Sequence, residues 1–341
     1  MRKLAVVRGP YLNLWDVGNY YGLCGMGYPV TFWGRGVDLD PFEERYPLAE
    51  FKNFAKPWEV LESEPDVIDT PDAFYEISYY FAERFERTVH VAWDNLPGRN
   101  TLSPKAMDAL PKFHKHVARS VMAVEALTYD GVDATRIRRI PGAVDTEFFS
   151  PPEKDAKRER AVLFVGRQTP EKGLWTLVYA MRVVDAPLWI AGATSEHSKS
   201  LAALADRLGV KVWWMGHLSR ERVRDAMRKA SIFCLPSIPK AGADPHATWM
   251  EQFGQVLIEA MACGTPVVAT RTGAIPEVVS DGGHLVEPMS PYALALALRS
   301  LLTKPDRWKG ISETARSRAE SVFDDSIVGK EIVEWYELNE R

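Results

Sequence analysis

Two glutamates, Glu251 and Glu259, stand eight positions apart around the start of a short apolar helix pattern over 255–262. Gly254 precedes this pattern, and Gly264 follows it at a place that suits the C-terminal stop of a helix. The first turn of a helix offers N–H groups and the positive end of the helix dipole, and a glycine lets a ligand come close to the backbone. This helix start is therefore predicted to bind a phosphate or another anionic group.

The two acids suit hydroxyl ligands. A carboxylate at Glu251, just before the helix, can accept hydrogen bonds from neutral hydroxyls such as those of a sugar. Glu259 lies among Leu257, Ile258 and Met261, where a carboxylate needs donors, and the vicinal hydroxyls of a ribose would supply two. A plainer alternative makes Glu251 a surface loop residue and Glu259 an acid on the helix surface.

The helix pattern belongs to a longer alternation of short apolar β-rich runs with helical stretches. Strands this apolar suit a parallel sheet that is covered on both faces. The polar, proline-led segment 151–160 interrupts the alternation, which then restarts. The expected strands are 4–8, 30–33, 67–68, 88–92, 120–124, 137–140, 161–166, 188–191, 212–214, 232–235 and 266–269, and the expected helices are 75–87, 105–118, 173–183, 200–208, 220–228 and 255–262.

This alternation predicts an α/β fold with two Rossmann-like, doubly wound parallel-sheet domains, residues 1–150 and 151–324, that face each other across a cleft. A last amphipathic helix, about 325–341, is expected to pack back on the first domain. Ligands of such sheets bind at the carboxyl ends of the strands, so the cleft is the expected site.

Composition narrows the class of function. The 341 residues carry a net charge of -4, which provides no overall basic field for nucleic acid. The three cysteines, Cys24, Cys234 and Cys263, are far apart and have no zinc-binding spacing, which favours buried thiols of a cytoplasmic protein. No run of 18 apolar residues is present, and the N-terminus resembles a first strand more than a signal peptide.

The phrase EQFGQVLIEAMACGTPVVATRTGAIPEVV resembles the signature of the GT-B glycosyltransferases of family 4, mostly retaining enzymes that use nucleotide-sugar donors. In that signature seven residues separate two glutamates, as they separate Glu251 and Glu259. Three other stretches also resemble this family: VLFVGRQTPEKG, WWMGHLSRERVRDAMRKASIFCLPS and IPGAVDTEFFSP. The resemblance is dense over 140–341 and thin over 1–139.

The resemblance implies roles for the second half of the chain. Arg167 and Lys172 would neutralise a diphosphate leaving group, without a required metal ion or cofactor. Glu251 would bind hydroxyls of the donor sugar and Glu259 the ribose, and the donor would be linked to UDP or GDP. The implied donor-binding set is Arg167, Lys172, Gly216, His217, Glu251, Phe253, Gly254, Gln255 and Glu259. The base, the sugar and the acceptor stay open at this point.

The first half departs from the family pattern. Many members carry a histidine just after a strand, and here the strand 88–92 ends without one. His90 lies inside that strand and is expected to be a packed residue. Asp94, a catalytic candidate, and Asn95 are the polar groups best placed to reach the cleft. In the first loop Tyr11, Asn13 and Trp15 are candidate acceptor contacts, with plain packing as the alternative.

Two further stretches carry open alternatives. The insertion 238–250 would act as a lid or an acceptor contact, or have no role, and its Asp244 and His246 form a weak metal signal. The stretch 110–124 is expected to be a basic, partly apolar helix. Such a helix would touch the cytoplasmic face of a membrane as a peripheral contact, or simply be a solvated face.

The expected function is that of a retaining, metal-independent glycosyltransferase of the hexosyltransferase type. It would move a sugar from a nucleoside diphosphate sugar to a hydroxyl acceptor, which is a saccharide, a lipid-linked sugar or a small molecule. The alternatives are a GT-B nucleotide-sugar epimerase or hydrolase and a non-catalytic nucleotide-sugar binding protein. Oligomeric state is left open.

Overall fold

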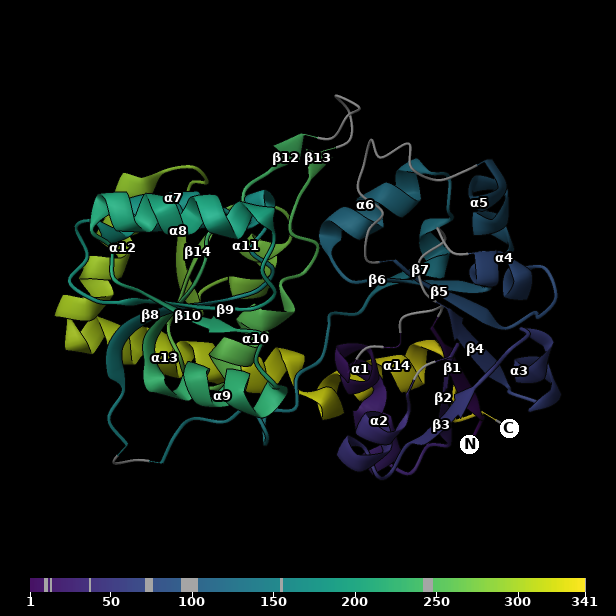
Figure 1. Ribbon diagram of the computed structural model, residues 1–341. Coiled ribbons are helices and arrows are strands. Elements are labelled where there is room, and N and C mark those ends of the chain that lie inside the picture. Colours follow the sequence, from purple (N-terminus) through teal and green to yellow (C-terminus); the bar gives the residue numbers. More distant parts are fainter. Residues whose placement is uncertain are drawn as a thin grey trace. The chain divides into compact units, whose positions relative to one another are not determined.

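The computed structural model describes residues 1–8, 12, 14–36, 38–70, 76–92, 104–153, 156–241 and 248–340, and the chain divides into two compact units. The first unit joins Met1–Ala143 to Phe323–Arg341, and the second unit is Val144–Val322. Each unit has its own parallel sheet with helices on both faces (Figure 1). The predicted α/β class with two parallel-sheet domains is confirmed.

The seven-stranded sheet of the first unit has the order β3-β2-β1-β4-β5-β6-β7, and its neighbouring strands are parallel. Its strands are β1 (Leu4–Val7), β2 (Val30–Gly34), β3 (Glu50–Asn53), β4 (Val67–Thr70), β5 (Thr88–Ala92), β6 (Lys115–Ala118) and β7 (Ile137–Arg139). The helices are α1 (Leu14–Gly25), α2 (Asp40–Arg45), α3 (Trp58–Glu62), α4 (Glu76–Ala82), α5 (Pro104–Ala109), α6 (Val121–Tyr129) and α14 (Asp325–Trp335).

Strand β1 shows why this sheet needs helices on both faces. Its side chains alternate, so Leu4 and Val6 join the core cluster that contains α1 and α14. Ala5 and Val7 join the cluster on the opposite face, with residues of α3 and α4. All four side chains are buried. An unbroken apolar strand is thereby explained by burial on both of its faces.

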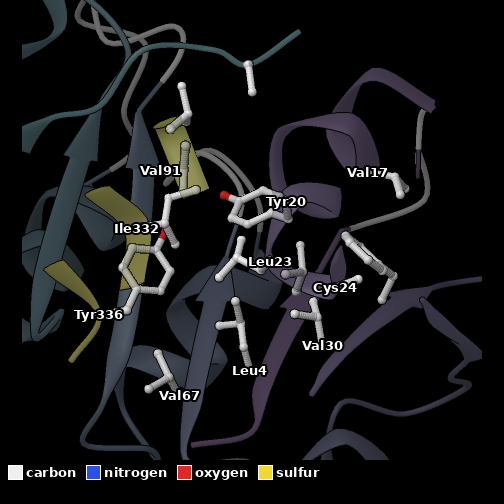
Figure 2. Packing of buried hydrophobic residues seen from close by; sticks show 14 of the residues in the cluster. Leu4, Val17, Tyr20, Leu23, Cys24, Val30, Val67, Val91, Ile332 and Tyr336 are labelled. Atoms are coloured by element: carbon white, nitrogen blue, oxygen red, sulfur yellow. The ribbon is translucent and has the colours of Figure 1, made fainter. Parts of the chain in front are cut away.

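Helix α14 packs against α1, and two glycines permit the close approach. A Cβ on Gly22 would lie 2.4 Å from the carbonyl oxygen of Asp325, and one on Gly329 would lie 2.7 Å from Cε of Met26. Figure 2 shows Ile332 of α14 and Tyr336, the residue that follows this helix, in one cluster with Tyr20 and other residues of α1. The C-terminal segment therefore completes the core of the first unit.

A buried polar centre ties this segment to the sheet. Asp69 of β4 accepts from Arg8 Nη1 at 2.8 Å and from the Tyr20 hydroxyl at 2.7 Å. The Tyr336 hydroxyl donates to the same Asp69 oxygen as Tyr20. Arg119 Nη2 donates to the Tyr20 hydroxyl at 3.2 Å. The carboxylate is fully buried and needs this many donors to offset its lost hydration.

The structure corrects the expectation of a basic helix over 110–124. The described stretch begins with a single 3-10 turn, η1 (Leu110–Lys112), and β6 (Lys115–Ala118) is a buried strand paired with β5. The predicted strand 120–124 is also wrong, because Ser120 caps α6 by accepting from the Ala123 N–H at 3.1 Å. The helical face on which the expected membrane contact depended is therefore not formed. Among the described residues no helix combines the length and the apolar character needed to cross a bilayer.

The six-stranded sheet of the second unit has the order β10-β9-β8-β11-β14-β15. Its strands are β8 (Glu159–Val165), β9 (Leu188–Ala191), β10 (Val212–Gly216), β11 (Ala230–Leu235), β14 (Val267–Thr270) and β15 (Gly283–Val286). The helices are α7 (Leu174–Met181), α8 (Glu196–Leu208), α9 (Arg220–Lys229), α10 (Gln255–Ala262), α11 (Ile275–Val279), α12 (Pro291–Thr303) and α13 (Pro305–Arg318). Figure 1 shows α7 and α12 on one face of this sheet and α9 and α13 on the other.

Two smaller elements of the second unit lie close to the carboxyl ends of its strands. The 3-10 turn η3 (Pro170–Lys172) follows β8. A separate antiparallel ribbon, β12 (Lys240–Ala241) and β13 (Thr248–Trp249), follows β11. The ribbon stands apart from the six-stranded sheet in Figure 1.

Candidate functional site

The centre of the candidate site is an ion pair between two of the predicted residues. Lys172 Nζ lies 2.7 Å from Glu251 Oε2, and the two side chains are only 12% and 10% exposed. The hydroxyl of Ser237 donates to the same glutamate oxygen at 2.8 Å. The carboxylate is thus held by one charged and one neutral donor, in a place that water hardly reaches.

The turn that carries Lys172 is packed tightly against the end of β11. Gly173 has φ of +67°, and a Cβ there would lie 1.9 Å from the carbonyl oxygen of Pro236. The N–H of Ile238 donates to the carbonyl of Glu171 at 2.9 Å. Only glycine fits this left-handed, crowded position, so the approach of the two loops depends on Gly173.

The backbone of Glu251 is fixed by the turn before α11. The N–H of Ala274 donates to the Glu251 carbonyl at 2.8 Å. Gly273, with φ of +57°, brings its backbone so close that a Cβ would lie 2.0 Å from that carbonyl oxygen. The turn before α11 therefore fixes the backbone of Glu251, and this close approach requires glycine at position 273.

Helix α10 begins at the glycine expected from the sequence. Gly254 is the N-cap residue, with φ of +85° and ψ of 55°. Glycine has no side chain, so no side-chain hydrogen bond from this residue caps the helix. Phe253 is almost fully buried just before it, and Gln255 is the first helical residue. The positive end of the helix dipole thus lies three residues after Glu251 in the chain.

Glu259 is buried on the second turn of α10, and it is 8% exposed. Burial raises the pKa of its carboxyl from 4.5 to about 7, and the charge of Arg220 opposes this rise. The carboxyl therefore keeps its proton to a higher pH than an exposed glutamate does. A ligand that donated hydrogen bonds to it would favour its charged form.

Other predicted donor residues are less closely held. Arg167 has a side chain that is 66% exposed, and its Nη2 lies 3.9 Å from Oε1 of Glu171. Gly216 ends β10 with φ of +66°, and its carbonyl accepts from the Gly192 N–H at 2.7 Å. His217, the next residue, is exposed. The structure joins Lys172 to Glu251 but does not join these residues to the pair.

Sequence reasoning missed two residues of this cluster. Ser237, which binds Glu251, follows a strand in the motif CLPS, and a hydroxyl after a strand end is the only signal it offered. Trp249 belongs to β13, and the centre of its ring lies 4.9 Å from Lys172 Nζ. Its only signal was its place two residues before Glu251.

The candidates of the first unit are mostly outside the described residues. Outside the described residues lie Tyr11, Asn13, Asp94 and Asn95. The same holds for Asp244 and His246, which belong to the insertion in the second unit. Trp15 lies in helix α1, and its side chain is likewise outside the description. In the parts of the chain that are described, no group of three or more histidine, cysteine or acidic side chains could hold a metal ion.

The expectation for His90 is confirmed, because its side chain is fully buried in β5. Its Nδ1 lies 3.0 Å from Nδ1 of His116 on the neighbouring strand β6. Burial lowers the pKa of His90 to about 3 and lowers the pKa of His116 well below its usual value. Both rings of the pair therefore stay neutral at ordinary pH.

Comparisons with known proteins agree with this geometry. The family model described as "Glycosyl transferases group 1" matches residues 145–318, a little more than half of the chain. An MMP alpha-(1->4)-mannosyltransferase of Mycolicibacterium hassiacum is 31% identical over 227 residues, which is 64% of this chain and 52% of that protein. A phosphatidyl-myo-inositol mannosyltransferase of Mycobacterium leprae is 34% identical over 225 residues, 63% of this chain and 55% of that protein. The chain spans about half the length of the curated relatives it matches.

Solved structures show the same fold at lower identity. HepE from Anabaena, in complex with UDP and glucose, has a TM-score of 0.81 at 18% identity and covers 98% of this chain and 99% of its own. Sucrose-phosphate synthase from Thermosynechococcus elongatus has a TM-score of 0.78 at 19% identity, with 98% of each chain covered. These likenesses confirm the GT-B architecture, and the family match confirms the resemblance seen in the sequence. The chain belongs to the glycosyl transferases of group 1.

Proposed function

We propose that this protein transfers a sugar, with retention of configuration, from a nucleoside diphosphate sugar to a hydroxyl acceptor. The observation that carries the proposal is the buried pair of Lys172 and Glu251 beside the uncapped start of α10. A cation, a carboxylate and a helix N-terminus are then available close together in the second unit. These are groups that suit a diphosphate and a neutral, hydroxyl-rich sugar.

Each residue has a role in this proposal. The Lys172 ammonium neutralises the charge that develops on the leaving diphosphate, and exposed Arg167 adds a second cation when the donor binds. The N–H groups at Gly254 and Gln255 contact the phosphate or the donor sugar. Glu251 accepts hydrogen bonds from sugar hydroxyls, and Glu259 accepts them from the ribose.

In this scheme the sugar transfer requires mainly electrostatic stabilisation and positioning from these residues. Breaking the bond to the sugar leaves negative charge on the diphosphate, and a fixed cation stabilises that charge without reorganisation. The diphosphate oxygen is itself able to take the proton of the acceptor hydroxyl, so positioning and electrostatics supply the catalysis. Such a scheme needs no metal ion, and the donor carries UDP or GDP. The complex of HepE with UDP supports a uridine donor as the first to be tried.

The test uses the full chain and begins with a thermal-shift screen of UDP, GDP, ADP and their common sugars, with and without chelator. The matching diphosphate should raise the melting temperature by mass action, and chelator should not remove the shift. Lys172→Met should reduce the shift, whereas the control Lys309→Met, at a 73% exposed lysine of the same unit, should keep it in full. No shift with any of the compounds would overturn the proposal.

A second step separates transfer from binding. Release of free UDP or GDP that depends on an added hydroxyl acceptor is the expected result. Retention is read from the anomeric configuration of the product by NMR. Binding without any turnover over a broad panel of acceptors would favour a nucleotide-sugar binding protein instead. Conversion of the donor sugar without an acceptor would favour an epimerase or a hydrolase.

A further inference from the structure

The proposed function leaves one element of the second unit without a role. The ribbon of β12 and β13 interrupts the chain between the end of β11 and Glu251. Lys240 pairs with Trp249 across this ribbon, and Ala241 pairs with Thr248. A short insertion that forms its own strand pair orients the side chains it carries, and the ring of Trp249 lies against the ion pair.

Trp249 contacts the cation of the site. Lys172 Nζ lies 4.9 Å from the centre of the indole ring on one side and 2.7 Å from Glu251 Oε2 on the other. A lysine ammonium within about 6 Å of a ring centre is attracted by the electrons of the ring face, and tryptophan is the strongest such partner. The lysine side chain is 12% exposed, so little water competes for its charge.

The ribbon is tied to both partners of the ion pair. Two residues before the ribbon starts, the N–H of Ile238 donates at 2.9 Å to the carbonyl of Glu171, the residue before Lys172. At its end Trp249 precedes Glu251 by two residues, and the Glu251 carbonyl is itself held by the Ala274 N–H. The ring, the ammonium and the carboxylate therefore form one connected unit, which is more specific than chance contact of a loop aromatic.

We propose that Trp249 is a positioning residue that holds the Lys172 ammonium in place for an incoming diphosphate. The inference rests on the proposed function, in which Lys172 contacts the diphosphate. A lysine has a flexible four-carbon stem, and an ammonium that is free to turn must be ordered when the ligand binds. The indole face orders it beforehand and excludes water from one side. The diphosphate then has to compete only with Glu251 for a cation that is already in position.

The first test is a double-mutant cycle read by titration calorimetry with UDP and with GDP. Trp249→Leu should weaken binding of the matching diphosphate by roughly 5- to 30-fold, the range that a cation–aromatic contact supports. Trp249→Phe keeps a ring face and should restore most of that loss. In a Lys172→Met background Trp249→Leu should change the affinity by less than about twofold, because the partner of the ring is gone. An equal loss in both backgrounds would overturn the proposal, since Trp249 would then act independently of Lys172.

The second test needs no ligand. Limited acetylation with acetic anhydride, followed by mass spectrometry, compares the reaction rate of Lys172 with that of exposed Lys309 in the same sample. The ratio should rise several-fold in Trp249→Leu and stay near the wild-type value in Trp249→Phe. An unchanged ratio in Trp249→Leu would overturn the proposal even if UDP or GDP binds. A changed ratio in a protein that binds neither diphosphate would support the positioning role and reject the proposed function instead.

Discussion

The raised pKa of Glu259 predicts a measurable dependence of stability on pH. Burial raises this pKa from 4.5 to about 7, so the folded protein holds the proton more tightly than the unfolded chain does. The associated stability is fully present below pH 4.5 and is lost as the pH rises through 7. A rise of the pKa from 4.5 to about 7 corresponds to about 3 kcal/mol of unfolding free energy, most of which is lost by pH 8.

The substitution Glu259→Gln removes the ionisable group and keeps the size of the side chain. Relative to wild type, the variant should gain about 2 to 3 kcal/mol of stability between pH 5 and pH 8, because only the wild type must bury a charge as the pH rises. Urea unfolding of the full chain at the two pH values measures the difference. Glu287→Gln, at a side chain that is 74% exposed, is the matched control and should show a much smaller change.

Comparison of the two pH values removes every effect of the substitution that does not depend on ionisation. If Glu259→Gln shifts stability by the same amount at pH 5 and at pH 8, the reasoning from burial is refuted. A further consequence concerns the ligand. Ribose hydroxyls that donate to Glu259 would favour its charged form, so diphosphate binding at pH 7 should release protons. Calorimetry in buffers of different ionisation enthalpy detects that release, and Glu259→Gln should abolish it.

Three other predictions concern stability. Lys172→Met leaves the buried Glu251 carboxylate without its cation and should cost about 2 to 4 kcal/mol of unfolding free energy, measured with urea. Adding Glu251→Gln should recover part of this loss, and fully additive losses would contradict the pairing. Gly273→Ala places a Cβ 2.0 Å from the Glu251 carbonyl oxygen at φ of +57°, and should lower the melting temperature and weaken diphosphate binding together; wild-type behaviour in both assays would disprove the crowding. Tyr336→Phe removes a donor from buried Asp69 and should cost about 1 to 3 kcal/mol by the same unfolding assay; an unchanged midpoint would count against the polar centre.

The part of the fold that the sequence predicts best is the helix of the site. The predicted range 255–262 is the range of α10, because glycines at both of its ends take positive φ. Gly254 has φ of +85° and Gly264 has φ of +61°. A local pattern with its own start and stop signals does not depend on distant contacts, and it is therefore visible in one sequence.

Strand β6 shows the opposite case. The run around Lys115–Ala118 was expected to continue a helix from residue 105. The short segment pairs with β5, where His116 lies opposite His90, and this pairing decides its conformation. Four residues are too few to show a period of two against a period of 3.6, so tertiary contact overrides the local pattern.

The site was predictable residue by residue but not as an arrangement. The family motif indicated both Lys172 and Glu251, each for a separate contact with the donor. Their ion pair joins positions 79 residues apart and arises from the packing of η3 against the end of β11. Trp249 enters the same cluster through a strand pairing of two residues on each side, which is too short to be read from a sequence.

The return of the C-terminal segment to the first unit has a consequence for synthesis on the ribosome. The first unit begins the chain, but α14 and Tyr336, which close its core, are made only after the whole of the second unit, 144–322. At typical translation rates that interval lasts about 10 to 35 seconds. During this time the surface of α1 that α14 later covers, including Tyr20 and Leu23, stays open to solvent. The nascent chain thus exposes this apolar surface of α1 to chaperones until α14 has been synthesised and packs on it.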